Sequence, residues 1–323
     1  MRCVSCGLID VHHHIIPPFY LEENRERIAG SRGGKISPAW LEWSAETAIE
    51  AMDEQGVDTA VTSLSTPGVW FGDAAAARTT ARRCNEYAAE LAQRYPGRFG
   101  RFAAVPLPDA DGSLNEIAYA LDVLKADGIG LLTSYGDRWL GDAAYLPVME
   151  ELNRRKAVVF VHPSVPTCCR ALLEDIPPLV AEIPQDTTRA VTNLLFSGTL
   201  SRFRDIRFIF THAGGSVPMV ANRMLHYAPQ HVHDRLAAMK ENMDSVLQRQ
   251  FYDIAGTAWA PAIAALCSYV PTSQILFGSD HPYVPLHDTA EGFAALTFSD
   301  AERQAIARDN ALRLLPSLKL SAG

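Results

Sequence analysis

The 323-residue sequence contains no apolar run close to the roughly 20 residues that a membrane-spanning helix needs. Its first 20 residues carry histidines, an aspartate and two prolines, which is not the pattern of a secretory signal peptide. Basic residues are the minority, with 29 Lys and Arg against 37 Asp and Glu, so the chain lacks the positive footprint of a nucleic-acid or anionic-membrane binder. These absences predict a cytoplasmic protein with no nucleic-acid or membrane partner.

Cysteine is also scarce, with six residues in the whole chain. Cys3 and Cys6 form a Cys-x-x-Cys pair, but no second pair completes a four-thiolate zinc site. Cys168 and Cys169 are neighbours in sequence, and such neighbours seldom form a disulfide. We therefore interpret the Cys3–Cys6 pair as part of an irregular N-terminal lead-in and expect no disulfide framework.

What the sequence does contain is an alternation of short, β-rich apolar runs and longer amphipathic stretches. Such near-continuous apolar strands separated by helices predict a parallel sheet that is covered on both faces. The eight strand-like runs are residues 7–13, 58–65, 99–107, 128–135, 157–163, 207–213, 251–258 and 274–280. Eight such units predict one (β/α)₈ TIM barrel, and we expect it to be a single domain over residues 1–323.

Residues 17–43 form a long insertion after the first predicted strand, and on a barrel this insertion would lie over the catalytic face. A doubly wound open sheet is the structural alternative. It would be favoured by a Gly-x-Gly-x-x-Gly turn after an early strand, and the sequence has none.

Ionisable side chains end four of the eight predicted strands. They are His12 and His14 on the first strand, His162 on the fifth, His212 on the sixth and Asp280 on the eighth. Because strand side chains alternate, His12 and His14 should point one way and His13 the other. Each of these residues alone could be an ordinary strand end that hydrogen-bonds a loop. All five at one rim of a barrel favour a functional site.

Three imidazoles and one carboxylate are a common ligand set for catalytic zinc, with one position left open for water or substrate. A fifth ionisable side chain would then be free for proton transfer. Two further residues are candidates for orienting these groups, namely Asp253 near the end of the seventh strand and His281 beside Asp280.

At this point the sequence resembles the amidohydrolase superfamily, and within it the branch typified by 2-amino-3-carboxymuconate-6-semialdehyde decarboxylase. The resemblance rests on IDVHHHIIPP, AMDEQGVDTAVTSLSTP, RFGRFAAVPL, VFVHP, THAGGSVPMVANR and ILFGSDHPY, which occur in family order over nearly the whole chain. It implies that the metal ligands are His12, His14, His162 and Asp280. It also implies that His212 is the catalytic acid/base and that Arg223 holds a substrate carboxylate.

The chain departs from the family in two places. The fourth predicted strand, GIGLLTSYGD, does not end in the lysine or glutamate that bridges two metals in many relatives, which favours one metal. The first helical stretch, AETAIEAMDEQG, lacks an arginine that the decarboxylase branch places there. This second departure argues against the dicarboxylate substrate of that branch.

Two enzyme classes fit these residues. The favoured one is a metal-dependent, non-oxidative decarboxylase of a small unsaturated or aromatic carboxylic acid, such as a 2-hydroxybenzoate, with Asp280 and His212 as catalytic residues. The alternative is a metal-dependent hydrolase of an ester, lactone or amide. A non-enzymatic metal-binding role would leave His212 unexplained. We expect one divalent ion per chain, with zinc the first candidate and manganese the second. The resemblance also implies a homodimer.

Overall fold

The computed structural model describes residues 7–31, 38–136, 138–166, 169 and 176–319. Cys3, Cys6 and Cys168 lie outside these residues, so the Cys-x-x-Cys interpretation stays a prediction. The described cysteines, Cys84, Cys169 and Cys267, are free thiols. No helix in the described part of the chain is long and apolar enough to cross a bilayer.

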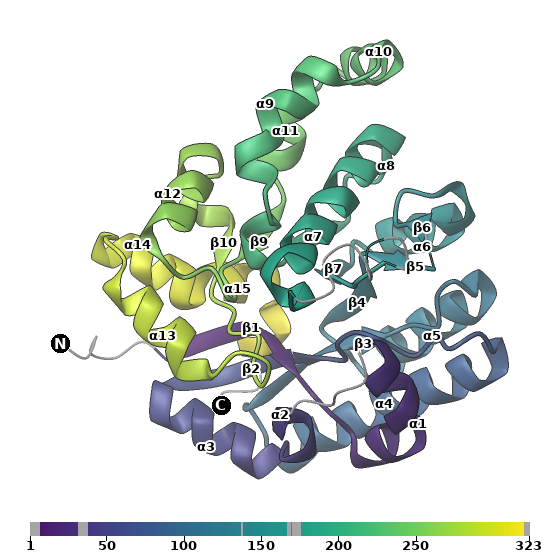
Figure 1. Ribbon diagram of the computed structural model, residues 1–323, viewed down its shortest axis with the longest axis vertical. Coiled ribbons are helices and arrows are strands. Elements are labelled where there is room, and N and C mark those ends of the chain that lie inside the picture. Colours follow the sequence, from purple (N-terminus) through teal and green to yellow (C-terminus); the bar gives the residue numbers. More distant parts are fainter. Residues whose placement is uncertain (1–6, 32–37, 137, 167–168, 170–175, 320–323) are drawn as a thin grey trace.

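Eight parallel strands form the central sheet, in the spatial order in which they follow one another along the chain (Figure 1). They are β1 (Leu8–His14), β2 (Val57–Ser63), β3 (Phe99–Ala104), β4 (Gly128–Leu132), β7 (Val158–His162), β8 (Arg207–Phe210), β9 (Phe251–Asp253) and β10 (Ile275–Leu276). Backbone hydrogen bonds close the ring between the first strand and the segment after the last, with Val11 N donating to Phe277 O and Asp280 N donating to His12 O. The predicted (β/α)₈ barrel is confirmed, and the open sheet is excluded.

Several strands end earlier than the apolar runs that predicted them. The run 128–135 is divided into β4 and a short antiparallel hairpin of β5 (Ser134–Tyr135) and β6 (Arg138–Trp139). The chain stays apolar past the strand ends because residues that follow them, such as Val105, Tyr135 and Ile254, are buried in the hydrophobic core. Hydrophobicity therefore overestimates the length of the strands at this end.

Helices cover the outside of the barrel (Figure 1). The principal ones are α3 (Ala45–Gln55), α4 (Ala74–Arg94), α5 (Ala110–Asp122), α6 (Leu146–Arg154), α7 (Pro178–Ser197), α9 (Val217–Tyr227), α12 (Ala260–Tyr269) and α13 (Leu286–Ala295). Local signals place their ends: α3 begins with Ser44 in a capping box and ends at Gly56, which adopts a φ of 72° that favours glycine. Beyond α9, the helices α10 (Gln230–Ala238) and α11 (Met243–Gln248) extend the molecule at the top of Figure 1.

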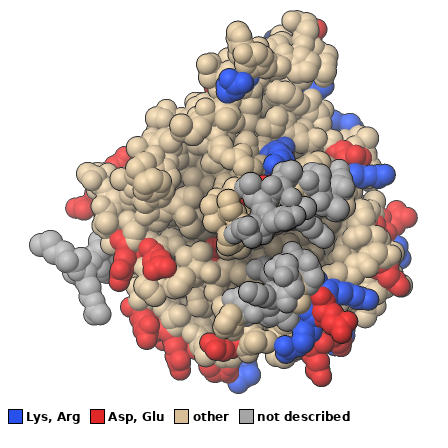
Figure 2. All heavy atoms as spheres, in the orientation of Figure 1, with Lys and Arg blue, Asp and Glu red and all other residues tan. Residues whose placement is uncertain are grey.

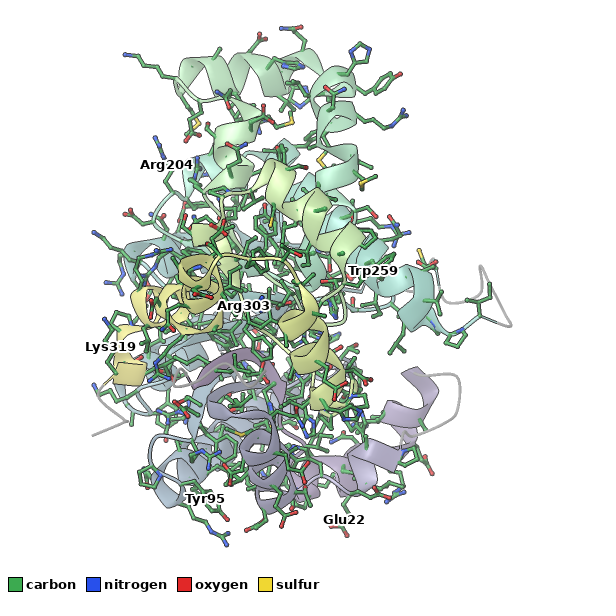
Figure 3. The ribbon with its side chains drawn as sticks, turned by 90° about the vertical axis from the view of Figure 1, so that its left-hand side faces the viewer. Glu22, Tyr95, Arg204, Trp259, Arg303 and Lys319 are labelled. Carbon is green, nitrogen blue, oxygen red and sulfur yellow. The ribbon has the colours of Figure 1, made fainter. Side chains whose placement is uncertain are left out.

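Side chains fill the barrel interior rather than leaving a channel. Phe102 and Phe160 stack with their ring centroids 5.1 Å apart, and they belong to one buried cluster with Ile209 and Leu276. The C-terminal segment adds Leu314 and Leu318 to the same cluster. In the side view of Figure 3, Lys319 in this segment and Trp259 before α12 lie on opposite sides of the molecule.

The predicted insertion after β1 consists of α1 (Pro18–Ser31) and α2 (Pro38–Leu41), with residues 32–37 not described. The Tyr20 hydroxyl donates to the Gly68 carbonyl in the loop after β2. The Trp40 ring packs edge-on against Tyr283, three residues after Asp280. These contacts place the insertion against loops at the carboxyl ends of the strands, as the sequence predicted.

Candidate active site

Four of the side chains singled out in the sequence meet at the carboxyl ends of β1, β7 and β10. They are His12, His14, His162 and Asp280, and one donor atom from each lies within 4.8 Å of the others. All four residues are buried. The barrel brings them together because β1 and β10 are neighbours in the ring and β7 faces them across it.

The three histidines share one arrangement, in which Nδ1 makes an outer contact and Nε2 faces the cluster. The Nδ1 partners are Asp253 Oδ2 at 3.0 Å for His12, Ser63 Oγ at 3.1 Å for His14 and the Pro163 carbonyl at 2.8 Å for His162. His12 Nε2 and His14 Nε2 are 3.2 Å apart, and His162 Nε2 is buried without a hydrogen-bond partner among the described atoms. Outer contacts of this kind leave the inner nitrogen lone pairs available to a cation.

This donor set suits a divalent metal, because three imidazole nitrogens and one carboxylate oxygen converge in a buried volume with no lysine or arginine among them. In the part of the chain that the structure describes, this is the one such group of His, Cys, Asp and Glu side chains. The expectation of one metal position, drawn from the end of the fourth strand, agrees with this geometry.

The Asp280 carboxylate uses its two oxygens differently. Oδ1 lies 3.0 Å from His14 Nε2 and 3.3 Å from His12 Nε2, whereas Oδ2 lies 3.3 Å from His212 Nε2. Burial alone would raise the pKa of Asp280, but the His12 and His14 imidazoles outweigh burial and hold that pKa well below its ordinary range. The group is therefore ionised at neutral pH.

His212 follows β8 in a tight turn, where it adopts a φ of 56°. Asp280 also has a positive φ, 67°. Residues with side chains rarely adopt this conformation, and such strain is concentrated at functional sites. Gly215 lets this turn lie close against α7, because a Cβ atom at this position would lie 2.0 Å from the Pro184 carbonyl oxygen.

Asp253, at the end of β9, contacts both the ligand cluster and the turn that carries His212. Its Oδ2 contacts His12 Nδ1, and its Oδ1 accepts from the backbone N–H of His212, each at 3.0 Å. The sequence marked Asp253 as an orienting candidate, and the structure places it against both a cluster histidine and the turn that carries His212.

Asp10 organises the opposite side of β1. Its carboxylate accepts from the His12 N–H, the Ser279 N–H and the Ser279 hydroxyl, and it contacts His13 Nδ1 at 3.0 Å. The His13 ring stacks on His281 with centroids 4.8 Å apart. His13 thus faces away from the cluster, as the alternation of strand side chains predicts.

Asp186 on α7 was not identified from the sequence. Its fully buried carboxylate accepts hydrogen bonds from the Thr133 hydroxyl, Trp139 Nε1 and the Ser164 N–H. Burial raises the pKa of Asp186. Ser164 comes two residues after His162, and the Thr133 N–H donates to the His162 carbonyl, so Asp186 ties together both segments that flank this histidine. An aspartate within an amphipathic helix carries no sequence signal for this role.

Arg223, the predicted carboxylate-binding residue, is exposed on α9. Its guanidinium lies over the Tyr227 ring, 5.1 Å from the centroid. Among the described side chains, no hydrogen bond or ion pair joins Arg223 to the four clustered residues. Its role stays a prediction.

Comparison with known proteins finds an amidohydrolase family profile and relatives that are named as decarboxylases. The profile of the amidohydrolase family matches residues 9–317. Decarboxylase yanB of Aspergillus niger is 36% identical over 97% of this chain and 89% of its own length. The 6-methylsalicylic acid decarboxylase acuB of Aspergillus aculeatus is 36% identical over 96% of both chains.

Solved structures agree with these sequence relatives. A crystal structure of an amidohydrolase II superposes with a TM-score of 0.88 at 28% identity, over 96% of this chain and all of that one. A 2,6-dihydroxybenzoate decarboxylase, crystallised with 2,6-dihydroxybenzoate, shares the fold with a TM-score of 0.81 at 23% identity, over 97% of this chain and all of that one. The chain therefore belongs to the amidohydrolase family, as its ordered motifs predicted.

Proposed function

We propose that this protein is a metal-dependent, non-oxidative decarboxylase of aromatic acids of the 2-hydroxybenzoate type. One observation carries the proposal. A buried cluster of three histidines and Asp280, with His212 on the second oxygen of Asp280, occurs in a chain that aligns almost end to end with decarboxylases, two of them named for 6-methylsalicylic acid.

The reaction breaks the bond between the ring and its carboxylate. The electron pair of that bond stays on the ring carbon, carbon dioxide leaves, and a proton takes its place. A divalent metal bound by His12, His14, His162 and Asp280 would chelate the substrate carboxylate with the adjacent hydroxyl and withdraw negative charge. His212 is the proposed proton donor to the ring carbon, because its Nε2 lies beside Asp280 and the four named ligands leave it free for proton transfer. Asp280 orients and stabilises the protonated imidazole.

Both zinc and manganese are candidates for the ion. Three imidazoles favour zinc. A dihydroxybenzoic acid decarboxylase from Polaromonas and a 5-carboxyvanillate decarboxylase from Novosphingobium aromaticivorans, which share this fold at 22% and 21% identity, were crystallised with manganese. Activity of protein reconstituted with each ion in turn distinguishes the two candidates.

A hydrolase would use the same ligand cluster, and it is less supported, since the two relatives that are 36% identical to this chain are named as decarboxylases. The discriminating experiment offers the metal-loaded protein a panel of 2-hydroxybenzoates and a panel of lactones and esters. We expect carbon dioxide from the first panel and no released acid from the second. The reverse result would establish the hydrolase.

We further propose a homodimer. Large apolar side chains are exposed on α9 and just before α12, namely Met219 (73% exposed), Tyr227 (67%) and Trp259 (61%). These two helices pack against each other, and the upper part of the face in Figure 2 carries few charges compared with its lower and right-hand edges. Exposed apolar surface of this kind is typical of a protein interface. Light scattering on the wild type and on a Met219→Glu/Tyr227→Glu variant tests it, with a monomeric variant expected.

A further inference from the structure

A small hollow, partly open to solvent, lies at the carboxyl ends of β2, β3, β4 and β7. His162 forms part of its wall, so the hollow adjoins the metal-ligand cluster. The other walls are mainly aliphatic. The side chains that define it are Leu64, Val69, Val105, Leu132 and Tyr135, with Phe160 at its base.

Several polar atoms of this wall already have partners inside the protein. The Tyr135 hydroxyl accepts from the Leu132 N–H at 2.9 Å, and the Gly68 carbonyl accepts from the Tyr20 hydroxyl at 2.6 Å. The backbone N–H and carbonyl of Ala104 are both bonded to the side-chain amide of Asn85. His162 uses Nδ1 on the Pro163 carbonyl and directs Nε2 into the cluster.

No charged side chain is among the described residues that line the hollow. Among the side chains of the wall outside the metal-ligand cluster, only the Tyr135 hydroxyl could form a hydrogen bond with a ligand hydroxyl, in exchange for the hydrogen bonds that the hydroxyl makes to water. A methyl group would lose nothing and would bury apolar surface. The hollow therefore distinguishes the two groups by chemistry, although they have nearly the same size.

We propose that this pocket, which we call the Val105 pocket, receives a ring substituent of the substrate and makes the enzyme selective for a methyl group over a second hydroxyl. This proposal rests on the proposed decarboxylation of 2-hydroxybenzoates, and it specifies which ring substituent the preferred substrate carries. The relatives include enzymes named for 6-methylsalicylic acid and others named for gamma-resorcylate, and the pocket favours the first kind of substrate for this chain.

The test measures kcat/KM of the metal-loaded enzyme for 2-hydroxy-6-methylbenzoate and for 2,6-dihydroxybenzoate, by release of carbon dioxide. Burying one methyl group in an apolar pocket is worth about 10- to 200-fold in kcat/KM, so we expect the methyl substrate to be preferred by about that factor. Equal or faster turnover of the dihydroxy acid would overturn the proposal.

Val105→Thr replaces one methyl group by a hydroxyl of nearly the same volume, which gives the pocket a donor and an acceptor. We expect the preference to shrink by about tenfold or more. Val69→Thr makes the same change at a second residue of the lining, in case the first variant does not fold. Val148→Thr, at a fully buried position on α6 outside the pocket, is the matched control and should leave the ratio unchanged. An unchanged ratio in folded Val105→Thr and Val69→Thr proteins counts against the pocket.

Ligand binding separates this proposal from the proposed reaction. Decarboxylation would yield 3-methylphenol or resorcinol, and calorimetry with the metal-loaded protein measures their affinities without turnover. Tighter binding of 3-methylphenol that Val105→Thr weakens supports the pocket even if no 2-hydroxybenzoate releases carbon dioxide, in which case only the proposed reaction fails. Equal binding of both phenols refutes the selectivity even if decarboxylation occurs.

Discussion

Asp280 Oδ2 lies 3.3 Å from His212 Nε2, while the other oxygen of the same carboxylate faces the clustered histidines. One side chain therefore touches both the proposed metal position and the proposed proton donor. Because the carboxylate is ionised, its Oδ2 can accept a hydrogen bond from His212 while the group contributes negative charge to the cation site. The predictions below test whether these two functions can be separated by mutation.

The ligand assignment predicts a contrast within the HHH run. His12→Ala and Asp280→Ala should each lose the metal, because each removes a converging donor atom. His13→Ala should keep it, although the buried contact between His13 and Asp10 is lost and stability falls. Elemental analysis of the purified variants measures the metal content. Loss of metal in His13→Ala with retention in His12→Ala would reverse the assignment.

Asp253 should act as a positioning residue for metal binding. Asp253→Asn keeps the volume but weakens the contact that orients His12, and substitutions of such partners typically lower metal affinity by about 10- to 100-fold. Chelator competition measures this change. Glu116→Gln is a suitable control, since Glu116 is also a buried carboxylate, on α5, that bonds Arg82 and Asn85 away from the site. Glu116→Gln should lower the free energy of unfolding without changing metal affinity. If both variants lose metal affinity to a similar extent, Asp253 contributes only to the stability of the fold.

Asp10 should make stability depend on pH. Burial raises the pKa of Asp10, but the hydrogen bonds from His13, Ser279 and the His12 N–H outweigh it, so the pKa lies below its ordinary value of 3.8. A lowered folded-state pKa stabilises the protein above the unfolded-state pKa, and that stabilisation is lost as the pH falls through the folded value.

We therefore expect Asp10→Asn to lower the free energy of unfolding by about 1.5–3 kcal/mol near neutral pH. The difference from wild type should shrink as the pH falls below 3.8. Urea unfolding of both metal-free proteins across this range measures it. A difference that is the same at all pH values would mean that Asp10 contributes only through packing.

Most of the barrel could be predicted from the sequence, because each of its strands is a nearly continuous apolar run and the ligand residues stand where those runs end. The supporting contacts could not. Asp186 bonds Thr133 and Ser164, which lie 53 and 22 residues away in the chain, and no local pattern in α7 marks it. Ser63 likewise has no distinguishing feature in the sequence of β2, and only the fold shows that its hydroxyl contacts His14. The single-domain division over residues 1–323 and the cytoplasmic location stay predictions.

The carboxylate-binding role of Arg223 was inferred from a motif match alone, and it can be tested by mutation. If it holds the substrate carboxylate, Arg223→Ala should raise KM by about tenfold or more while the metal content stays at the wild-type level. Arg303→Ala serves as the control, since Arg303 donates to the backbone carbonyls of Phe293 in α13 and of Leu296 after it and lies over the Phe293 ring. A wild-type KM in Arg223→Ala would make Arg223 a solvent-exposed residue over Tyr227, which is where the isolated chain places it.

His212 bears most directly on the mechanism. Its Nε2 contacts Asp280, while its Nδ1 is buried with no hydrogen-bond partner among the described atoms. Removing a positioned acid/base typically costs about 10²- to 10⁴-fold in rate. We expect His212→Asn to keep its fold and metal but to lose turnover by that factor. If His212 is instead a ligand, metal content should fall together with activity. Both quantities are measured on one preparation, and wild-type turnover would remove His212 from the mechanism altogether.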